Sequence, residues 1–294
     1  MIKAKLLVKS NNILGECPIW DTFNKKLYWI DIIKNKIHSY SYLTRKLESL
    51  QLDQMIGCLA LTKQNSLIVA LQDGIYHLDH SCKNLQLISV PNDLNNEIRF
   101  NDGKCDPNGN FLAGTMALDE KRFIGTLYLF KEKKIYPLLK EVGISNGIAF
   151  SLDGQILYFN DSLKGKIFQY HYNINNNRLE NEQIVLSLGD HNGYPDGMTI
   201  DEEGMLWVAL WGKGEVIKVN PNKKKIINSY DLPVLNATSC AFGGYGMRNL
   251  FVTTAKKGLS KQELLKYPLS GGVFSITTKT RGLLPSLCDL SNFI

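Results

Sequence analysis

One short pattern recurs along this chain, and it limits the possible folds more than any other feature. A polar corner residue is followed by Gly or Cys, a short apolar strand, a turn and a second strand rich in aromatic or β-branched residues. The clearest copies occupy residues 193–210, 145–159 and 101–113, and weaker copies occupy 16–29, 57–69 and 239–252. Six copies of one unit predict a repeat architecture.

The spacing of the copies identifies the kind of repeat. Successive copies are 41, 45, 44, 50 and 43 positions apart, counted from the small residue after each corner: Cys17, Cys58, Gly103, Gly147, Gly197 and Cys240. Periods of about 40–50 residues that contain several short strands are typical of β-propeller blades. We therefore predict an all-β fold, a single six-bladed β-propeller domain over residues 1–294, with four antiparallel strands in each blade.

The two ends of the chain must join if the ring is to close. Residues 4–8 have the pattern of a strand without a hairpin partner, and we expect them to form the outer strand of the sixth blade, which removes two exposed strand edges. Two loops interrupt the repeat, at 116–124 in the third blade and at 256–268 in the sixth. The second loop contains the one helix-like piece, Lys261–Lys266. Inserted loops tend to carry function.

Composition excludes several classes of function. The net charge of +6 is spread over isolated lysines and short runs, without a basic stripe interleaved with aromatic residues, so we expect no nucleic-acid partner. No apolar run approaches the roughly 18–20 residues of a membrane span, and the Lys-rich first ten residues do not resemble a signal peptide. These features predict a cytoplasmic protein without a membrane partner. They do not determine the oligomeric state, for which we expect a monomer or a weak homodimer.

The six cysteines show no Cys-x-x-Cys pair. Four of them, Cys17, Cys58, Cys105 and Cys240, fall at or near the start of a predicted strand. We expect the cysteines to be small buried hydrophobic residues in a reducing compartment, and neither disulfides nor zinc ligands.

The corner residues are the candidates for chemistry. In a propeller the innermost strands line a central channel, so equivalent corners from different blades converge near one mouth of it. The corners are Glu16, Gly57, Asn101 or Asp102, Asn146, Asp196 and Ser239. Carboxylates and amide carbonyls around an axis match the preference of Ca²⁺, Mg²⁺ or Mn²⁺. Any one such corner is also ordinary turn chemistry, but recurrence at one place in the repeat favours a metal site.

Two further patterns support weaker hypotheses. Gly143–Gly147 matches the Gly-x-Ser-x-Gly nucleophile elbow, but the residues after it have the pattern of two strands, where an elbow requires a helix. His191 lies five residues before Asp196 and could line the channel, although a solvated loop histidine is the simpler interpretation. Trp211 ends its strand, where it could rim the channel mouth.

Taken together, these segments resemble the regucalcin and gluconolactonase family, calcium-dependent six-bladed propellers that hydrolyse sugar lactones. The resemblance rests on residues 14–20, 99–104 with 113–116, 144–147, 194–198 with 206–209, 238–244 and 268–274. It covers nearly the full chain. It implies a hydrolase, a lactonase of the gluconolactonase type that opens an aldonolactone to the aldonic acid, with a small-molecule sugar lactone as its partner.

The resemblance also implies roles for particular residues. One divalent metal ion, with Ca²⁺ favoured and Zn²⁺, Mn²⁺, Fe²⁺ or Mg²⁺ as alternatives, is expected on Glu16, Asn146 and Asp196. Substrate is expected on Arg99, Asn101 and Asp119, although close relatives often carry Glu at the last of these positions. A lactone needs a Lewis acid on its carbonyl oxygen and a base for the attacking water, and Asp196 is the candidate base.

Two alternatives stay open on the sequence alone. The same fold could serve as a non-enzymatic, calcium-binding regulatory propeller, or as a related propeller hydrolase acting on another ester or lactone. The metal-binding corners combined with Arg99 and Asn101 favour catalysis, because a binding platform needs no polar channel mouth.

Overall fold

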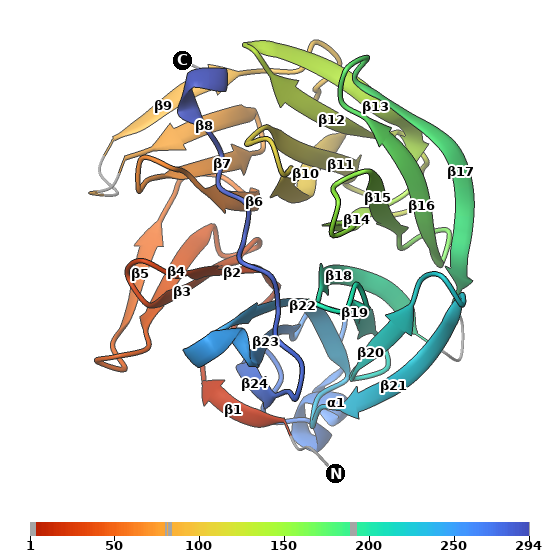
Figure 1. The fold of residues 1–294 in the computed structure, drawn as a ribbon. Helices are drawn as coiled ribbons and strands as arrows, with labels where there is room; N and C mark the ends of the chain where they lie inside the picture. The colour runs from red at the N-terminus through yellow and green to blue at the C-terminus, as the bar shows by residue number, and fades with distance from the viewer. Residues whose placement is uncertain (1–3, 80, 82–83, 189–192, 294) are drawn as a thin grey trace.

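The computed structural model describes residues 4–79, 81, 84–188 and 193–293. Within these ranges, 24 strands form six four-stranded antiparallel sheets, which are arranged as blades around a central axis (Figure 1). This confirms the predicted six-bladed β-propeller. None of the described helices has the length and hydropathy needed to cross a bilayer.

The blades follow the order of the chain, and each begins with the strand nearest the axis. Blades 1 to 3 consist of β2 (Gly15–Asp21), β3 (Lys26–Asp31), β4 (Lys36–Ser41) and β5 (Leu47–Gln51); β6 (Ile56–Leu61), β7 (Leu67–Leu71), β8 (Gly74–Leu78) and β9 (Leu85–Ser89); and β10 (Ile98–Cys105), β11 (Phe111–Ala117), β12 (Gly125–Lys131) and β13 (Lys134–Val142). Blades 4 to 6 consist of β14 (Ser145–Phe150), β15 (Ile156–Asp161), β16 (Lys166–Asn173) and β17 (Arg178–Ser187); β18 (Tyr194–Ile200), β19 (Leu206–Trp211), β20 (Glu215–Asn220) and β21 (Lys225–Asp231); and β22 (Asn236–Gly243), β23 (Asn249–Ala255), β24 (Val273–Thr277) and β1 (Lys5–Val8). The described helical pieces are α1 (Lys261–Lys266), η2 (Tyr245–Met247) and η3 (Leu290–Asn292).

The first strand closes the ring, as the sequence predicts. β1 pairs antiparallel with β24, with Lys5 opposite Ser275 and Leu6 opposite Phe274. Blade 6 therefore combines both ends of the repeat region, and hydrogen bonds between the first and last strands hold the ring shut. The helix expected at Lys261–Lys266 is confirmed as α1.

Burial falls from the axis outwards, because only the inner strands are covered by neighbouring blades on both faces. Every residue of β6 and β14 is buried, whereas β21 at the rim is almost wholly exposed. Large aromatic side chains such as Trp29, Trp207 and Phe251 fill the space between the blades. Burial of this kind contributes about 1.5–3 kcal/mol per large apolar side chain, so the inner strands form a stiff channel wall.

Each innermost strand carries a register shift of the β-bulge type near its corner residue. The shifts lie between Glu16 and Ile19, Ile56 and Cys58, Phe100 and Asp102, Asn146 and Ile148, Pro195 and Met198, and Ala237 and Ser239. A bulge bends the strand and re-aims its side chains. The sequence places the corners where their strands begin, and Glu16, Asn146 and Asp196 do lie within the first three residues of β2, β14 and β18. The bulge directs these side chains into the channel.

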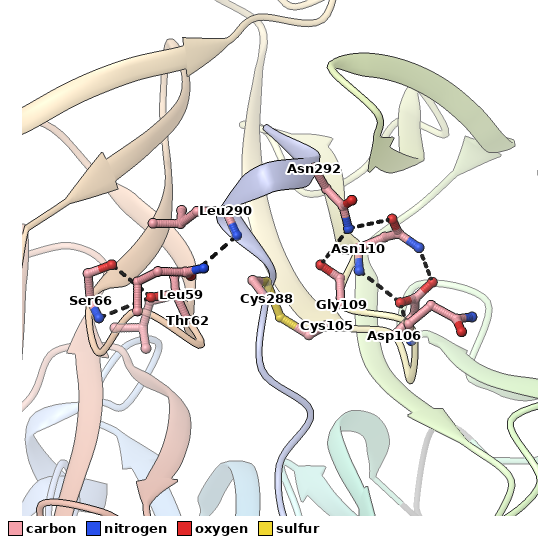
Figure 2. The surroundings of a disulfide bond; sticks show 12 residues. Leu59, Thr62, Ser66, Cys105, Asp106, Gly109, Asn110, Cys288, Leu290 and Asn292 are labelled. Carbon is pink, nitrogen blue, oxygen red and sulfur yellow. Dashed lines mark hydrogen bonds between the residues drawn. A yellow bond between two sulfur atoms is a disulfide. The ribbon is translucent and has the colours of Figure 1, made fainter. Parts of the chain in front are cut away.

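After β24 the chain crosses the ring as a strap, which we define as residues 278–293 (Figure 1). The backbone N–H of Gly282 donates to the carbonyl oxygen of Met247 in blade 6, and that of Cys288 donates to Leu61 in blade 2. A disulfide joins Cys288 to Cys105 at the end of β10, with their Cα atoms 5.6 Å apart (Figure 2). The strap therefore links blade 6 to blades 2 and 3 across the axis.

The disulfide overturns one expectation. Cys105 is not the reduced, buried thiol that the sequence pattern suggested, and the same holds for Cys288. The two residues are 183 positions apart, and only the path of the strap brings them together. The expectation is confirmed for Cys17, Cys58 and Cys240, which are buried free thiols; Cys82 lies outside the described residues.

Candidate active site

A cavity of about 280 Å³ lies at one mouth of the central channel, and we call it the front cavity. Four corner residues line it, each from a different innermost strand: Glu16, Asn101, Asn146 and Asp196. Arg99 and Trp211 also contribute to its wall, as the sequence suggested. The predicted convergence of four oxygen-bearing corners is therefore present in the structure.

The other corner residues do not reach the front cavity. Asp102 and Ser239 line a separate cavity at the opposite end of the channel. Gly57 instead lets its strand approach the next blade, because a Cβ there would lie 2.4 Å from the carbonyl oxygen of Phe100. Of the two candidates in blade 3, Asn101 faces the front and Asp102 faces the rear, and the register shift between Phe100 and Asp102 lies at the point where they diverge.

A chain of hydrogen bonds fixes the amide groups of the front cavity. Arg99 Nη1 donates to Asn101 Oδ1 at 2.6 Å. Asn101 Nδ2 donates to Asn146 Oδ1 and to the carbonyl oxygen of Ser145, both at 2.9 Å. Asn146 Nδ2 donates in turn to Ser162 Oγ at 2.8 Å. The side-chain oxygen of Asn146 is held in one orientation and keeps a second lone pair for another partner.

The backbone after Asn146 requires a glycine, which is Gly147. Its φ is +43°, and an added Cβ would lie 2.1 Å from Asn160 Nδ2 and 2.5 Å from the carbonyl oxygen of Asp196. Asn160 Nδ2 donates to that same oxygen at 2.6 Å. Glycine thus permits the left-handed bulge and lets β14 approach β18 closely, which brings Asn146 beside Asp196.

Glu16 and Asp196 are buried carboxylates, each only 6% exposed. Burial raises the pKa of Glu16 well above its usual range, and the charges of Asp196 and Asp102 raise it further. Burial likewise raises the pKa of Asp196 well above its usual range, with Asp102 adding to the effect. Arg99 and Lys257 oppose the shift of Asp196 from a distance, and within the described ranges neither cation forms an ion pair with it. The cavity therefore holds more buried negative charge than its neighbours balance.

This donor set fits a hard divalent cation. A cation beside Glu16 and Asp196 would offset both the desolvation and the mutual repulsion that raise their pKa values. Two carboxylates and an amide oxygen suit Ca²⁺, Mg²⁺ or Mn²⁺ better than zinc, which favours sulfur and imidazole ligands. No three His, Cys, Asp or Glu side chains gather for a metal anywhere in the described part of the chain, so the amide oxygen of Asn146 is an essential member of this set.

The loop after β11 presents Glu120 to the cavity, where the sequence pointed to Asp119. Asp119 is turned outwards, accepts from Arg122 Nε at 2.5 Å and does not line the cavity. Glu120 lines the cavity and forms an ion pair with Lys257 from the sixth-blade loop. Glu120 has a φ of +59°, so the chain reverses between the two acids and their side chains diverge.

Glu120 and Lys257 are the charged residues of the front cavity that the sequence did not indicate. The backbone N–H of Lys257 donates to Ile13, and its carbonyl oxygen accepts from Asn236 Nδ2 at 2.9 Å, so the loop is well anchored. The sequence carried one signal for this pair: Glu120 and Lys257, which have opposite charges, stand on the two loops that we identified as interruptions of the repeat. Those loops come from blades 3 and 6, and their closeness depends on the ring.

The weaker hypotheses from the sequence have clear outcomes. Ser145 lies within β14, and a further strand of the same blade follows, so Gly143–Gly147 lacks the helix that a nucleophile elbow needs. His191 lies outside the described residues.

A family model matches most of the chain. The family model described as SMP-30/Gluconolactonase/LRE-like region matches residues 14–256. The chain belongs to this family. A curated relative, the putative sugar lactone lactonase YvrE of Bacillus subtilis (strain 168), is 34% identical over 283 residues, which cover 96% of this chain and 97% of the relative.

Solved structures agree with the family assignment. A luciferin-regenerating enzyme superposes with a TM-score of 0.93 at 28% identity, covering 99% of this chain and 100% of that one. A calcium-binding protein, regucalcin from Agrobacterium tumefaciens strain C58, superposes with a TM-score of 0.92 at 25% identity, covering 97% of both chains. Proteins similar to this chain are thus described as a lactonase, as a luciferin-regenerating enzyme and as calcium-binding.

Proposed function

We propose that this chain is a divalent-metal-dependent hydrolase that opens a sugar lactone to the aldonic acid, an activity of the gluconolactonase type. The observation that carries the proposal is the pair of buried carboxylates, Glu16 and Asp196, gathered with the oriented amide of Asn146 beside Arg99 in a 280 Å³ cavity. The family membership and the relative described as a sugar lactone lactonase support it.

In this proposal Glu16, Asn146 and Asp196 hold one divalent cation. Ca²⁺ is favoured because all the donors are hard oxygens, and the Agrobacterium regucalcin is described as calcium-binding. When bound, the cation supplies a Lewis acid for the carbonyl oxygen of the lactone.

The remaining chemistry belongs to the side chains of the cavity. The Asp196 carboxylate accepts a proton from water as the water oxygen bonds to the carbonyl carbon. The bond from that carbon to the ring oxygen then breaks, and the proton passes to the ring oxygen, which becomes a hydroxyl. Arg99 orients the sugar hydroxyls through its remaining guanidinium donors. Asn101 offers them the second lone pair of its side-chain oxygen, because both of its N–H donors are already used. At the mouth, Glu120 provides an acceptor for a hydroxyl.

A pH-indicator assay of acid release from a panel of aldonolactones tests this function. The protein is assayed after chelation and again after adding Ca²⁺, Mn²⁺, Fe²⁺ or Zn²⁺ singly. We expect hydrolysis to disappear on chelation and to return with a divalent cation. A folded, metal-loaded protein that hydrolyses none of the lactones would instead favour the regulatory propeller.

Metal binding should release protons and stabilise the fold more strongly as pH rises. The pKa values of Glu16 and Asp196 are raised above 4.5 and 3.8, the ordinary values for these side chains. Their protonated forms therefore stabilise the metal-free fold fully below those ordinary values, and this contribution is lost as pH rises through the raised pKa values. Bound calcium would offset this loss of stability, because it neutralises the ionised carboxylates of Glu16 and Asp196. We expect the calcium-dependent rise in Tm to be larger at about pH 8 than at about pH 5.

Two measurements check this prediction. Thermal unfolding with and without Ca²⁺ gives the Tm gain at each pH. Calorimetric titrations in buffers of different ionisation enthalpy give the number of protons released. A pH-independent Tm gain without proton release would contradict it.

Glu120 and Asp119 offer a matched pair of substitutions on one loop. Glu120→Gln should raise KM by about tenfold, since a lost charge-assisted hydrogen bond is worth about 1.5–3 kcal/mol. Asp119→Asn should leave KM within about twofold, because exposed ion pairs such as Asp119 with Arg122 contribute little. Steady-state kinetics on the lactone that is hydrolysed fastest gives the KM of both variants. The reverse pattern would show that the loop closes differently over substrate.

A further inference from the structure

A second cavity of about 280 Å³ lies at the opposite end of the channel, and we call it the rear cavity. The innermost strands serve both ends. In β2, for example, Glu16 faces the front cavity, whereas residues 17–20 line the rear one. No described residue lines both cavities. Much of the rear wall is apolar, with Leu59, Phe150 and Phe242 among its residues.

Lys104 is the cation of the rear cavity. Its Nζ donates one hydrogen bond, to the carbonyl oxygen of Met198 at 2.9 Å. Among the described residues it has no carboxylate within ion-pair distance and no second hydrogen-bond acceptor. An ammonium group has three donors, so two are available. Lys104 is half-buried, and an ammonium group partly removed from water is stabilised by an anionic partner.

Asp102, two residues earlier in β10, does not supply that partner. Its Oδ1 accepts from the backbone N–H of Gly103 at 2.7 Å, and the N–H of Gly147 also donates to this carboxylate. Lys104 attracts Asp102 only at longer range, because the two are not within ion-pair distance in the described structure. The carboxylate is thus held by backbone donors, and the free donors of Lys104 remain at the cavity.

The strap forms the outer wall of the rear cavity through residues 283–286. This span lies between the hydrogen-bonded anchors at Gly282 and Cys288. Among the described residues, no backbone hydrogen bond joins 283–287 to the blades. Leu284 in this span is 68% exposed. A segment fixed at both ends and unbonded between them opens locally at low free energy, which provides a route into the cavity.

We propose that the rear cavity is a binding site for a small carboxylate with an apolar body, of about the size of hexanoate. The carboxylate accepts the two remaining hydrogen bonds of Lys104, and the apolar body packs against Leu59, Phe150 and the strap. A charge-assisted hydrogen bond is stronger inside such a cavity than in water. The site is separate from the front cavity and does not depend on the proposed hydrolysis.

Calorimetric titration of hexanoate into the chelated full-length protein tests the site. Chelation matters because a metal in the front cavity could itself bind a carboxylate. We expect one saturable site in the unaltered chain and an affinity reduced by about tenfold or more in Lys104→Leu. The neutral analogue of the same length, hexan-1-ol, should bind at least about tenfold more weakly than hexanoate and should not distinguish the two proteins.

Two methionines report which cavity is occupied. Met198 lines the rear cavity and Met116 lines the front one. With methyl-labelled methionine, hexanoate should shift the NMR signal of Met198 and leave that of Met116 unchanged. A shift of Met116 alone, the absence of saturable binding, or equal affinity in Lys104→Leu would overturn the proposal. The NMR result uses the unaltered chain, so it decides even if Lys104→Leu does not fold.

Discussion

Replacing Asp196 by Asn should abolish lactone hydrolysis and weaken divalent-metal binding while the propeller stays folded. The substitution keeps the size of the side chain but removes one of the two buried negative charges of the front cavity. It also removes the proposed acceptor of the proton from water. Loss of a general base together with a charged metal ligand is expected to lower kcat/KM by about a thousandfold or more.

Asp102→Asn is the matched control. Asp102 is also a buried carboxylate, but it lines the rear cavity. We expect this variant to retain most activity and most metal affinity. Activity on the lactone panel, calcium titration and circular dichroism are measured for both variants. An Asp196→Asn protein with near-normal turnover would refute the proposed roles of this residue. Equal losses of activity in both variants would show that removing any buried negative charge near the channel lowers activity, and that Asp196 has no specific role.

Breaking the disulfide between Cys105 and Cys288 should be the largest stability effect of a change outside the front cavity. The bond spans 183 positions of the chain, and cross-links over long loops typically stabilise by about 2–5 kcal/mol, through reduced freedom of the unfolded chain in one model. We expect a dithiol reductant to lower the Tm by several degrees. The ring should persist, because the pairing of β1 with β24 also closes it.

The buried free thiols provide the control. Cys240→Ser keeps the disulfide and should respond to reductant like the unaltered protein, whereas the double variant Cys105→Ser, Cys288→Ser should not respond at all. A thiol titration under denaturing conditions confirms that two further thiols appear on reduction. If the Tm is unchanged although those thiols have appeared, the strap is held by its other contacts. The hydrogen bonds of Cys288 to blade 2 and the burial of Leu290 and Phe293 are then sufficient.

The blade pattern could be predicted from the sequence because it depends on contacts between neighbours in the chain. Each blade is built from consecutive strands joined by short turns, and the alternation of apolar residues and the turn residues specify it locally. Local patterns also located β1, because its strand pattern lacks a hairpin partner and so required a partner elsewhere. They located α1 as well, whose N-terminus is stabilised by a capping box between Ser260 and Glu263.

The candidate site was only partly visible in the sequence. Glu16, Asn146 and Asp196 recur at one place in the repeat, so ring symmetry alone predicts that they meet. The repeat alone did not separate Asn101 from Asp102, and only the family resemblance selected Asn101. Their assignment to opposite ends of the channel depends on a bulge in β10. The family resemblance pointed to Asp119 and did not consider Glu120. The left-handed backbone at Glu120 turns Glu120 towards the cavity in place of Asp119.

The sequence by itself thus determined the all-β repeat, its six blades, its closure and three of the corners that converge, because these properties arise from local patterns repeated with a period. The tertiary structure alone decided the pairing of Glu120 with Lys257, the disulfide of Cys105 with Cys288 and the existence of two cavities. Each of these depends on segments that are distant along the chain: two inserted loops, one blade and the strap, or the innermost strands of several blades. No repeat period specifies such contacts; they follow from how the ring and the strap place those segments in space.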